Sequence, residues 1–380
     1  MTPKFITPSV LAWARKRAGL SIGDIAEKFG LEESLVVKWE QGEETPTFRQ
    51  AQALARMLRV PFGYLFLSKP PRDRSPLPDF RTKAGHAPVE PSPDFMEVLY
   101  DTQRKQAWYR ERLERRDRPA LSFAGKFSLS DSVERVADDI RKHLSIDDEL
   151  RSQSPNWEDF LRTIIRNAES IGILVMRTGT VCGNSHRPLD VEEFRGFAIS
   201  DDLAPVVFLN GRDAKAAQIF TFAHEIAHIW IGESGISNPN LSVKSTEQAN
   251  RTEIFCNRIA AEVLVPRGSF ISHWSNRRDA SENVTLLARF YRVSSLVVAR
   301  QGYDLNLMGR DEFYQQLKKS YKGKTSKGGG NYYMNLFARN SPTLTATITR
   351  ALSEGSILYN EAAMLLGVQV PTLQKLAATL

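Results

Sequence analysis

The sequence is poor in cysteine and has no long apolar run. Its 380 residues include two cysteines, Cys182 and Cys256, which are too few for a framework of disulfides. No run approaches the roughly 18 apolar residues that a membrane-spanning helix needs. The opening residues, MTPKFITPSV, lack the apolar core and cleavage site of a secretory signal. We therefore expect a protein of the reducing cytoplasm that does not span a membrane.

The charge is moderately basic and unevenly distributed. The chain has 51 Lys and Arg against 44 Asp and Glu, a net charge of +7. Residues 104–118 hold seven basic and three acidic residues, and residues 318–327 hold five lysines and no acid. Such an excess is compatible with a nucleic-acid partner, but a solvated helix face for the first stretch and a flexible linker for the second are the simpler interpretations.

The most informative stretch is His224-Glu225-Ile226-Ala227-His228. On a helix, positions i and i+4 lie on the same face, so both imidazoles can bind one metal ion. Glu225 would stand beside that ion, where it can take a proton from a water molecule. The flanking residues are apolar on most sides, which predicts a buried helix whose polar groups need partners. Two histidines without a metal on such a helix are the alternative.

A second helical pattern downstream offers a third metal ligand. Two histidines leave a tetrahedral zinc short of one protein ligand and one open position. Glu253 begins this pattern, and Asn257, one turn later, could accept the free ring N–H of a ligand histidine. Glu262 is a competing carboxylate, deeper in the apolar run that ends at Pro266. Cys256 could close the fourth position, although a packed thiol is the simpler interpretation.

These residues resemble the ImmA/IrrE family of zinc metallopeptidases. The matching signature is HEIAH followed by E-x-x-C-N-x-x-A-A-E-x-L-V-P, and it covers roughly residues 164–266. The resemblance implies zinc as cofactor, His224, His228 and Glu253 as ligands, and Glu225 as general base. It also implies a regulatory protein as substrate, often a repressor.

The first 67 residues carry a different pattern. Helices are expected over about 8–18, 21–29, 32–40, 47–58 and 61–66, separated by glycine and proline. The stretch SIGDIAEKFGLEESLVVKWEQG resembles the helix-turn-helix of phage-repressor domains of the XRE type. That resemblance implies a DNA-binding domain that acts as a homodimer on a pseudo-palindromic site.

The DNA-binding face of this domain would rest on four polar residues: Ser34, Lys38, Gln41 and Arg49. Glu32 and Glu33 open the expected recognition helix, and carboxylates repel phosphate. Docking onto another protein is therefore the alternative role of this fold.

A proline-rich connector follows from Pro70 to Pro93, and its segment Pro78–Thr82 is either a docking element for the next domain or part of a passive tether. A long helix is expected over 93–117. Strands are expected over 171–176, 194–200 and 204–210. We take 204–210 as a sheet edge that pairs with substrate, with a plain core strand as the alternative. By residue type alone, His273 and Tyr291 are candidates for stabilising the oxyanion.

The expected fold is α+β and mostly helical. Residues 1–67 form a five-helix repressor-like domain, and residues 68–118 a linker and a long basic helix. Residues 119–310 form a zincin-like metallopeptidase domain with a small sheet, and residues 331–380 a small helical region.

The expected function is that of a cytoplasmic regulatory metallo-endopeptidase fused to a DNA-binding domain. Its substrate would be a repressor or antitoxin in a stress, prophage or toxin–antitoxin circuit. The alternative is a transcriptional regulator whose metal site is a sensor or a structural element.

Overall fold

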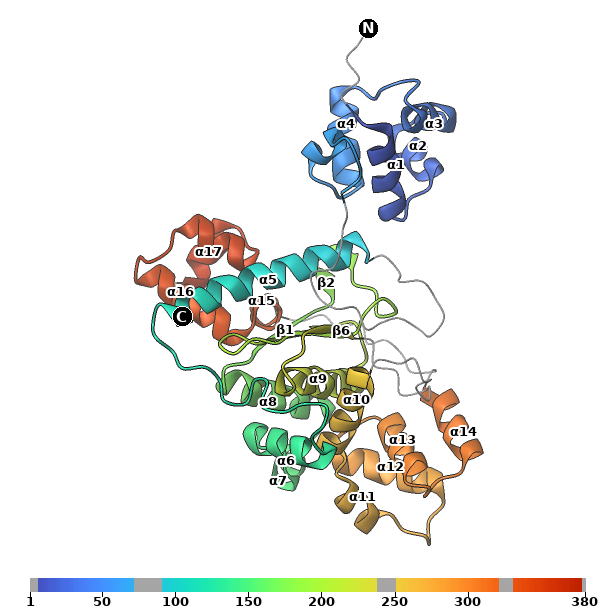
Figure 1. The fold of residues 1–380 in the computed structure, drawn as a ribbon, viewed down its shortest axis with the longest axis vertical. Helices are drawn as coiled ribbons and strands as arrows, with labels where there is room; N and C mark the ends of the chain where they lie inside the picture. The colour runs from blue at the N-terminus through green and yellow to red at the C-terminus, as the bar shows by residue number, and fades with distance from the viewer. Residues whose placement is uncertain (1–5, 72–90, 238–250, 321–330, 378–380) are drawn as a thin grey trace. The chain divides into compact units, whose positions relative to one another are not determined.

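The computed structural model describes residues 6–71, 91–237, 251–320 and 331–377 (Figure 1). The predicted docking segment Pro78–Thr82 and most of the lysine-rich stretch lie outside these residues. The described residues form two compact units, 6–71 with 91–99, and those from 100 onward. Helices dominate both units, and the second unit also contains a four-stranded mixed sheet and a two-stranded hairpin. This confirms the prediction of an α+β, mostly helical protein. Across these ranges, no helix combines the length and the apolar character that crossing a membrane requires.

The first unit contains α1 (Pro8–Arg17), α2 (Ile22–Phe29), α3 (Glu33–Gln41), α4 (Phe48–Met57) and a 3-10 helix, η1 (Phe62–Phe66). Capping boxes open α2 and α4. The hydroxyls of Ser21 and Thr47 each accept a backbone N–H three residues later, and the side chains of those later residues accept in return. Gly30 and Gly42 end α2 and α3 in the left-handed conformation that glycine adopts readily. These local signals explain why the helix pattern was predictable.

The core of the first unit is apolar, and an ion pair links two of the helices around it. Ile25, Val36 and Leu54 are almost fully buried in it. The Arg15 guanidinium donates to both carboxylate oxygens of Glu40, at 2.6 and 2.9 Å, and so ties α1 to α3.

The second unit is built around a four-stranded sheet. The strands are β1 (Leu174–Thr178), β5 (Val206–Asn210), β4 (Gly196–Ile199) and β6 (Gly235–Ser237), in that spatial order. β1 and β5 are parallel, whereas β4 runs antiparallel to both β5 and β6. A separate hairpin joins β2 (Thr180–Val181) to β3 (Asn184–Pro188).

The prediction that 204–210 forms a sheet edge is wrong. β5 lies between β1 and β4, and all five of its residues are buried. An unbroken apolar run without alternation is typical of a strand covered on both faces. Among the described strands, β1 and β6 are at the edges.

Helices cover both faces of this sheet. α8 (Trp157–Ser170) and α9 (Lys215–Trp230) pack on one face (Figure 1), and α9 contacts α6 (Val133–Leu144) and α10 (Arg251–Leu264). On the other face lies α15 (Tyr332–Asn340), beside α5 (Pro93–Glu114). The remaining helices are α7 (Asp148–Gln153), α11 (Arg267–His273), α12 (Ala280–Tyr291), α13 (Ser295–Asp304), α14 (Arg310–Ser320), α16 (Pro342–Ser353), α17 (Tyr359–Leu366) and α18 (Val370–Ala377).

A buried carboxylate joins the C-terminal helices to the sheet. Glu169, near the end of α8, accepts the N–H of Val175 at 2.7 Å. It also accepts the Ser341 hydroxyl at 3.0 Å and the Thr343 N–H at 2.9 Å, at the beginning of α16. Burial raises the pKa of this carboxyl, and the donors around it partly oppose that shift.

Replacing Glu169 should therefore destabilise the second unit. Glu169→Ala leaves three donors without their acceptor, which costs about 3 kcal/mol of unfolding free energy. Urea unfolding measures the loss. Glu134→Ala, an exposed glutamate on α6, is the matched control and should change stability by less than about 0.5 kcal/mol. Equal stabilities of the two variants would contradict the anchoring role of Glu169.

Candidate metal centre

Helix α9 carries both histidines and is enclosed by the protein. His224, Glu225 and His228 have no exposed surface. The helix packs on β4 and β5. At its last residue, the Trp230 indole donates to Asp139 at 2.9 Å and stacks on Phe123 with centroids 4.5 Å apart. This fixes the rotation of α9, and with it the direction of the two imidazoles.

Helix α10 brings the third side chain and is held at both ends. At its beginning, the Thr252 hydroxyl donates to Glu233, just beyond α9, at 2.8 Å. At its end, Arg151 donates to the carbonyl of Leu264 at 3.2 Å, and Arg141 to that of Glu262 at 2.5 Å. Two arginines thus satisfy carbonyl groups that a helix leaves without partners in its last turn.

His224, His228 and Glu253 converge at one point. The two Nε2 atoms are 3.1 Å apart, and the carboxylate oxygens of Glu253 lie 3.2 Å from Nε2 of His224 and 3.0 Å from Nε2 of His228. Donors of a tetrahedral zinc with bonds of about 2.1 Å are about 3.4 Å apart. Two imidazoles and a carboxylate at this spacing therefore fit a zinc ion.

The electrostatics of the cluster suit metal binding. Burial lowers the pKa of His228, so this imidazole is neutral at pH 7. Burial alone would raise the pKa of Glu253, but the two imidazoles outweigh it and bring that pKa to about 2. An ionised carboxylate is the form in which glutamate binds a metal. Burial also raises the pKa of the Cys256 thiol well above its ordinary value, and Cys256 is not among the residues whose ligand atoms converge.

Comparison with known families agrees with this geometry. Residues 168–301 match the family model described as the IrrE N-terminal-like domain, and residues 11–65 match the model described as helix-turn-helix. The chain joins a helix-turn-helix domain to an IrrE N-terminal-like domain. The predicted fusion is thereby confirmed, and the second domain is of a metallopeptidase family. No curated protein and no solved structure matched the chain.

The structure differs from the expected contact of Asn257, and it places Glu262, the competing carboxylate, away from the histidines. The Asn257 Oδ1 and the Nδ1 of His224 are both buried, and neither makes a hydrogen bond within the described residues, so the expected contact is not formed. Both oxygens of Glu262 accept the N–H of Arg267, at 3.1 Å each, and so cap α11. Glu262 lies nine residues beyond Glu253, about 13 Å along α10, too far to share its ion.

The two oxyanion candidates lie elsewhere in the IrrE-like domain. The Tyr291 ring packs under Arg151, 5.6 Å from its guanidinium carbon. Arg151 caps the end of α10, eleven residues beyond Glu253, or about 16 Å along the helix axis. His273 stacks on Phe290 with centroids 4.6 Å apart and contacts the Tyr291 ring, so it belongs to the same region. These two residues were predicted from residue type alone, which carries no information about where a side chain lies in the fold.

Sequence reasoning missed two features beside the ligands. Glu233 holds the beginning of α10 through Thr252, and Gly196 of β4 lies against Glu225. Neither belongs to the HExxH pattern. The only signal in the sequence was a glycine in an otherwise apolar strand, which often marks close approach of another element.

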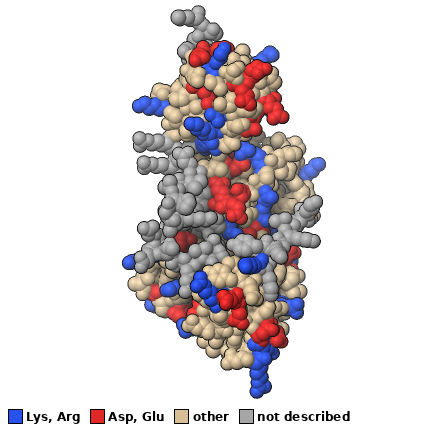
Figure 2. All heavy atoms as spheres, turned by 90° about the vertical axis from the view of Figure 1, so that its right-hand side faces the viewer, with Lys and Arg blue, Asp and Glu red and all other residues tan. Residues whose placement is uncertain are grey.

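In the helix-turn-helix domain, the residues predicted to contact DNA are exposed: Ser34, Lys38, Gln41 and Arg49. Lys38 donates to Glu44 at 2.9 Å, and both side chains are about half exposed. Glu32, Glu33 and Glu43 are exposed in the same segment. On the side of the molecule drawn in Figure 2, basic and acidic side chains are interspersed, with no continuous basic surface among the described residues.

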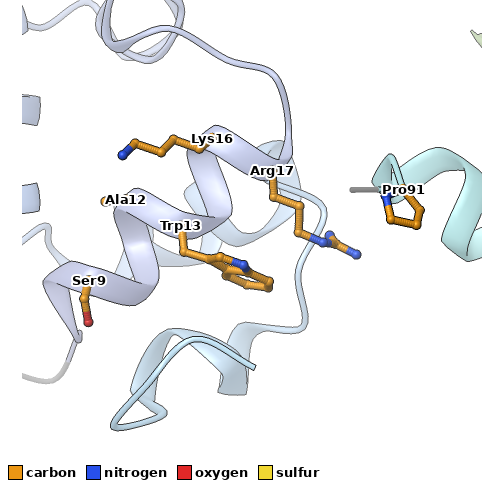
Figure 3. A pocket seen from close by; sticks show the side chains of 6 residues that line it. All are labelled: Ser9, Ala12, Trp13, Lys16, Arg17 and Pro91. Carbon is orange, nitrogen blue, oxygen red and sulfur yellow. The ribbon is translucent and has the colours of Figure 1, made fainter. Parts of the chain in front are cut away.

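A hollow of about 520 Å³ lies in the first unit. It is lined by Ser9, Ala12, Trp13, Lys16 and Arg17 of α1 together with Pro91 (Figure 3). The Arg17 guanidinium lies 5.4 Å from the centroid of the Trp13 ring. The hollow shares no residue with the histidine–glutamate cluster or with α3.

The geometry of the cluster predicts that Glu253, and not Glu262, is the third zinc ligand. The purified wild type should contain about one zinc per chain, and His224→Ala and Glu253→Ala should lose it, because two ligands bind the ion much more weakly than three. Metal analysis after dialysis measures the content. Glu262→Ala is the matched control on the same helix and should retain the ion. Retention by Glu253→Ala together with loss by Glu262→Ala would reverse the assignment.

Proposed function

We propose that the IrrE-like domain is a zinc-dependent endopeptidase with His224, His228 and Glu253 as ligands and Glu225 as general base. The observation that carries this proposal is the convergence of two buried histidines and the partly buried Glu253, whose donor atoms all lie within 4.8 Å of one another. Glu225 follows His224 on the same buried helix. The match of residues 168–301 to a metallopeptidase family supports the same reaction class.

The chain's own residues divide the work of hydrolysis. Zinc, when bound, polarises the peptide carbonyl and lowers the pKa of water. His224, His228 and Glu253 hold the ion from two helices that are fixed at their ends. Glu225 takes a proton from the attacking water and passes it to the leaving amine. Its burial strengthens this step, because a carboxylate shielded from bulk water interacts more strongly with a nearby proton donor.

The substrate class follows from the family resemblance. We propose a regulatory protein, such as a repressor or an antitoxin, in a stress, prophage or toxin–antitoxin circuit. We also propose a cytoplasmic location, which agrees with two cysteines that form no disulfide. A helix-turn-helix domain in the same chain supports a role in gene regulation.

Replacing Glu225 distinguishes a peptidase from a regulator with a structural metal, because only the peptidase needs this side chain as a base. Glu225→Gln keeps the three ligands and removes the base, so it should retain zinc and lose about 10²- to 10⁴-fold in cleavage rate. Cleavage of repressor proteins from the same circuit, followed by mass spectrometry, measures the rate. Glu282→Gln, an exposed glutamate on α12, is the matched control. Undiminished cleavage by Glu225→Gln would sink the mechanism, and a wild type that holds zinc but cleaves nothing would favour the regulator without peptidase activity.

We further propose that the helix-turn-helix domain binds DNA as a homodimer through Ser34, Lys38, Gln41 and Arg49. All four side chains are exposed, three of them on α3 and Arg49 at the beginning of α4. The exposed glutamates of the same segment weaken attraction to phosphate, so binding should depend on few backbone contacts.

Variation of the Lys38–Glu44 pair tests this proposal. Lys38→Ala should weaken binding about 5- to 10-fold and reduce the salt dependence by about one phosphate contact. Glu44→Gln should strengthen binding, because it releases Lys38 and removes a negative charge. Gel shifts of genomic fragments at several salt concentrations measure both effects, with the exposed Arg56→Ala on α4 as control. If wild type shifts no fragment at low salt, the domain is a protein-docking module instead.

A further inference from the structure

Strand β4 packs against α9, the helix that carries the two histidines, and the first residue of this strand, Gly196, has no side chain. Gly196 pairs with Leu209 on one side and Ser237 on the other, so it lies inside the sheet. Successive residues of a strand point to opposite faces. Phe197 stacks on Phe208, with centroids 4.8 Å apart, whereas Ala198 belongs to the core that includes α9. Gly196 therefore shares the face of Ala198, and β4 presents two small residues to α9.

The space that a side chain at Gly196 would occupy is filled. A Cβ atom built there would lie 2.7 Å from Cγ2 of Thr221, 2.9 Å from Oε1 of Glu225 and 2.9 Å from the carbonyl oxygen of Phe208. These separations are far below the 3.5–4.0 Å at which carbon makes favourable contacts. Gly196 is not among the glycines with positive φ. The position therefore needs glycine for its space and not for its backbone conformation.

The filled space belongs to the reactive face of α9. Thr221 and Glu225 are four residues apart, so they lie on one face of the helix, and that face is turned toward β4. His224 and His228 form a second pair at the same spacing, and their imidazoles meet Glu253 of α10. The helix thus directs the carboxylate of Glu225 against the strand and the metal ligands against α10.

We propose that Gly196 is a positioning residue for Glu225. The missing side chain leaves the volume in which the carboxylate rests, and a methyl group there would displace it while leaving the three ligands in place. This assignment rests on the proposed role of Glu225 as general base. The spatial competition itself does not depend on catalysis, so it can be tested separately.

The first test uses metal-free, full-length protein and a double-mutant cycle. Gly196→Ala should lower the melting temperature by roughly 4–8 °C, because overpacking forces neighbouring groups to move. In the Glu225→Ala background the same change should cost a smaller shift, since the carboxylate no longer competes for the space while the contacts with Thr221 and Phe208 remain. Gly302→Ala is the matched control: a Cβ there would lie 3.2 Å from the Trp274 ring. Its shift should be the same in both backgrounds.

The second test uses the zinc-loaded protein. Gly196→Ala should keep its zinc but lose at least tenfold in cleavage rate, because a misplaced base is a poor proton acceptor. Adding Thr221→Ser removes the nearest methyl group, so it should recover part of the melting temperature but not the rate. If the role of Gly196 were purely structural, Thr221→Ser would recover the melting temperature and the cleavage rate together.

Two results would overturn the assignment. One is an equal melting shift for Gly196→Ala with and without the Glu225 carboxylate. The other is full cleavage activity in Gly196→Ala. Failure of the proposed function would give a different result, namely a wild type that cleaves nothing. In that case the melting temperatures of the double-mutant cycle still decide whether Gly196 and Glu225 compete for one space.

Discussion

The second unit depends on one constraint, which is the burial of three polar side chains on α9. His224, Glu225 and His228 have no exposed surface, and buried polar groups are costly unless they have partners. The carboxylate of Glu253 meets both imidazoles, so α10 must lie alongside α9. Hydrogen bonds from Thr252, Arg141 and Arg151 hold α10 in this position at its two ends. A centre assembled from two helices keeps its geometry only if neither helix can slide.

The sequence predicted most of this centre because its signals are local. The HExxH spacing placed both histidines on one face of a helix, and the capping residues and glycines marked the helices of the first unit. The errors concern contacts between elements that are distant in the sequence. The position of β5 inside the sheet depends on its pairing with β1 and β4, and the contact expected between Asn257 and a ligand histidine depends on how α10 packs on α9. The small size of Gly196 has meaning only once α9 is packed against it.

The helix-turn-helix domain combines a fold that suits DNA with a surface that only partly does. Its helix boundaries, caps and buried core agree with one another, which is typical of a sequence that specifies one structure. Its α3 segment nevertheless exposes Glu32, Glu33, Glu43 and Glu44 and turns Lys38 toward one of them. Fold and surface charge are therefore separate properties of this domain, and the partner is decided by the surface.

The Glu169 anchor bears on how such a chain can be divided or recombined. The N–H groups at the beginning of α16 and of β1 share a single carboxylate on α8, so residues more than 160 positions apart complete one another's hydrogen bonds. A gene fragment ending before residue 331 would encode a sheet without α15 on one face and an acid without two of its three donors. The last four helices therefore belong to the same compact unit as the sheet, and separating them from it would cost the stability of both parts.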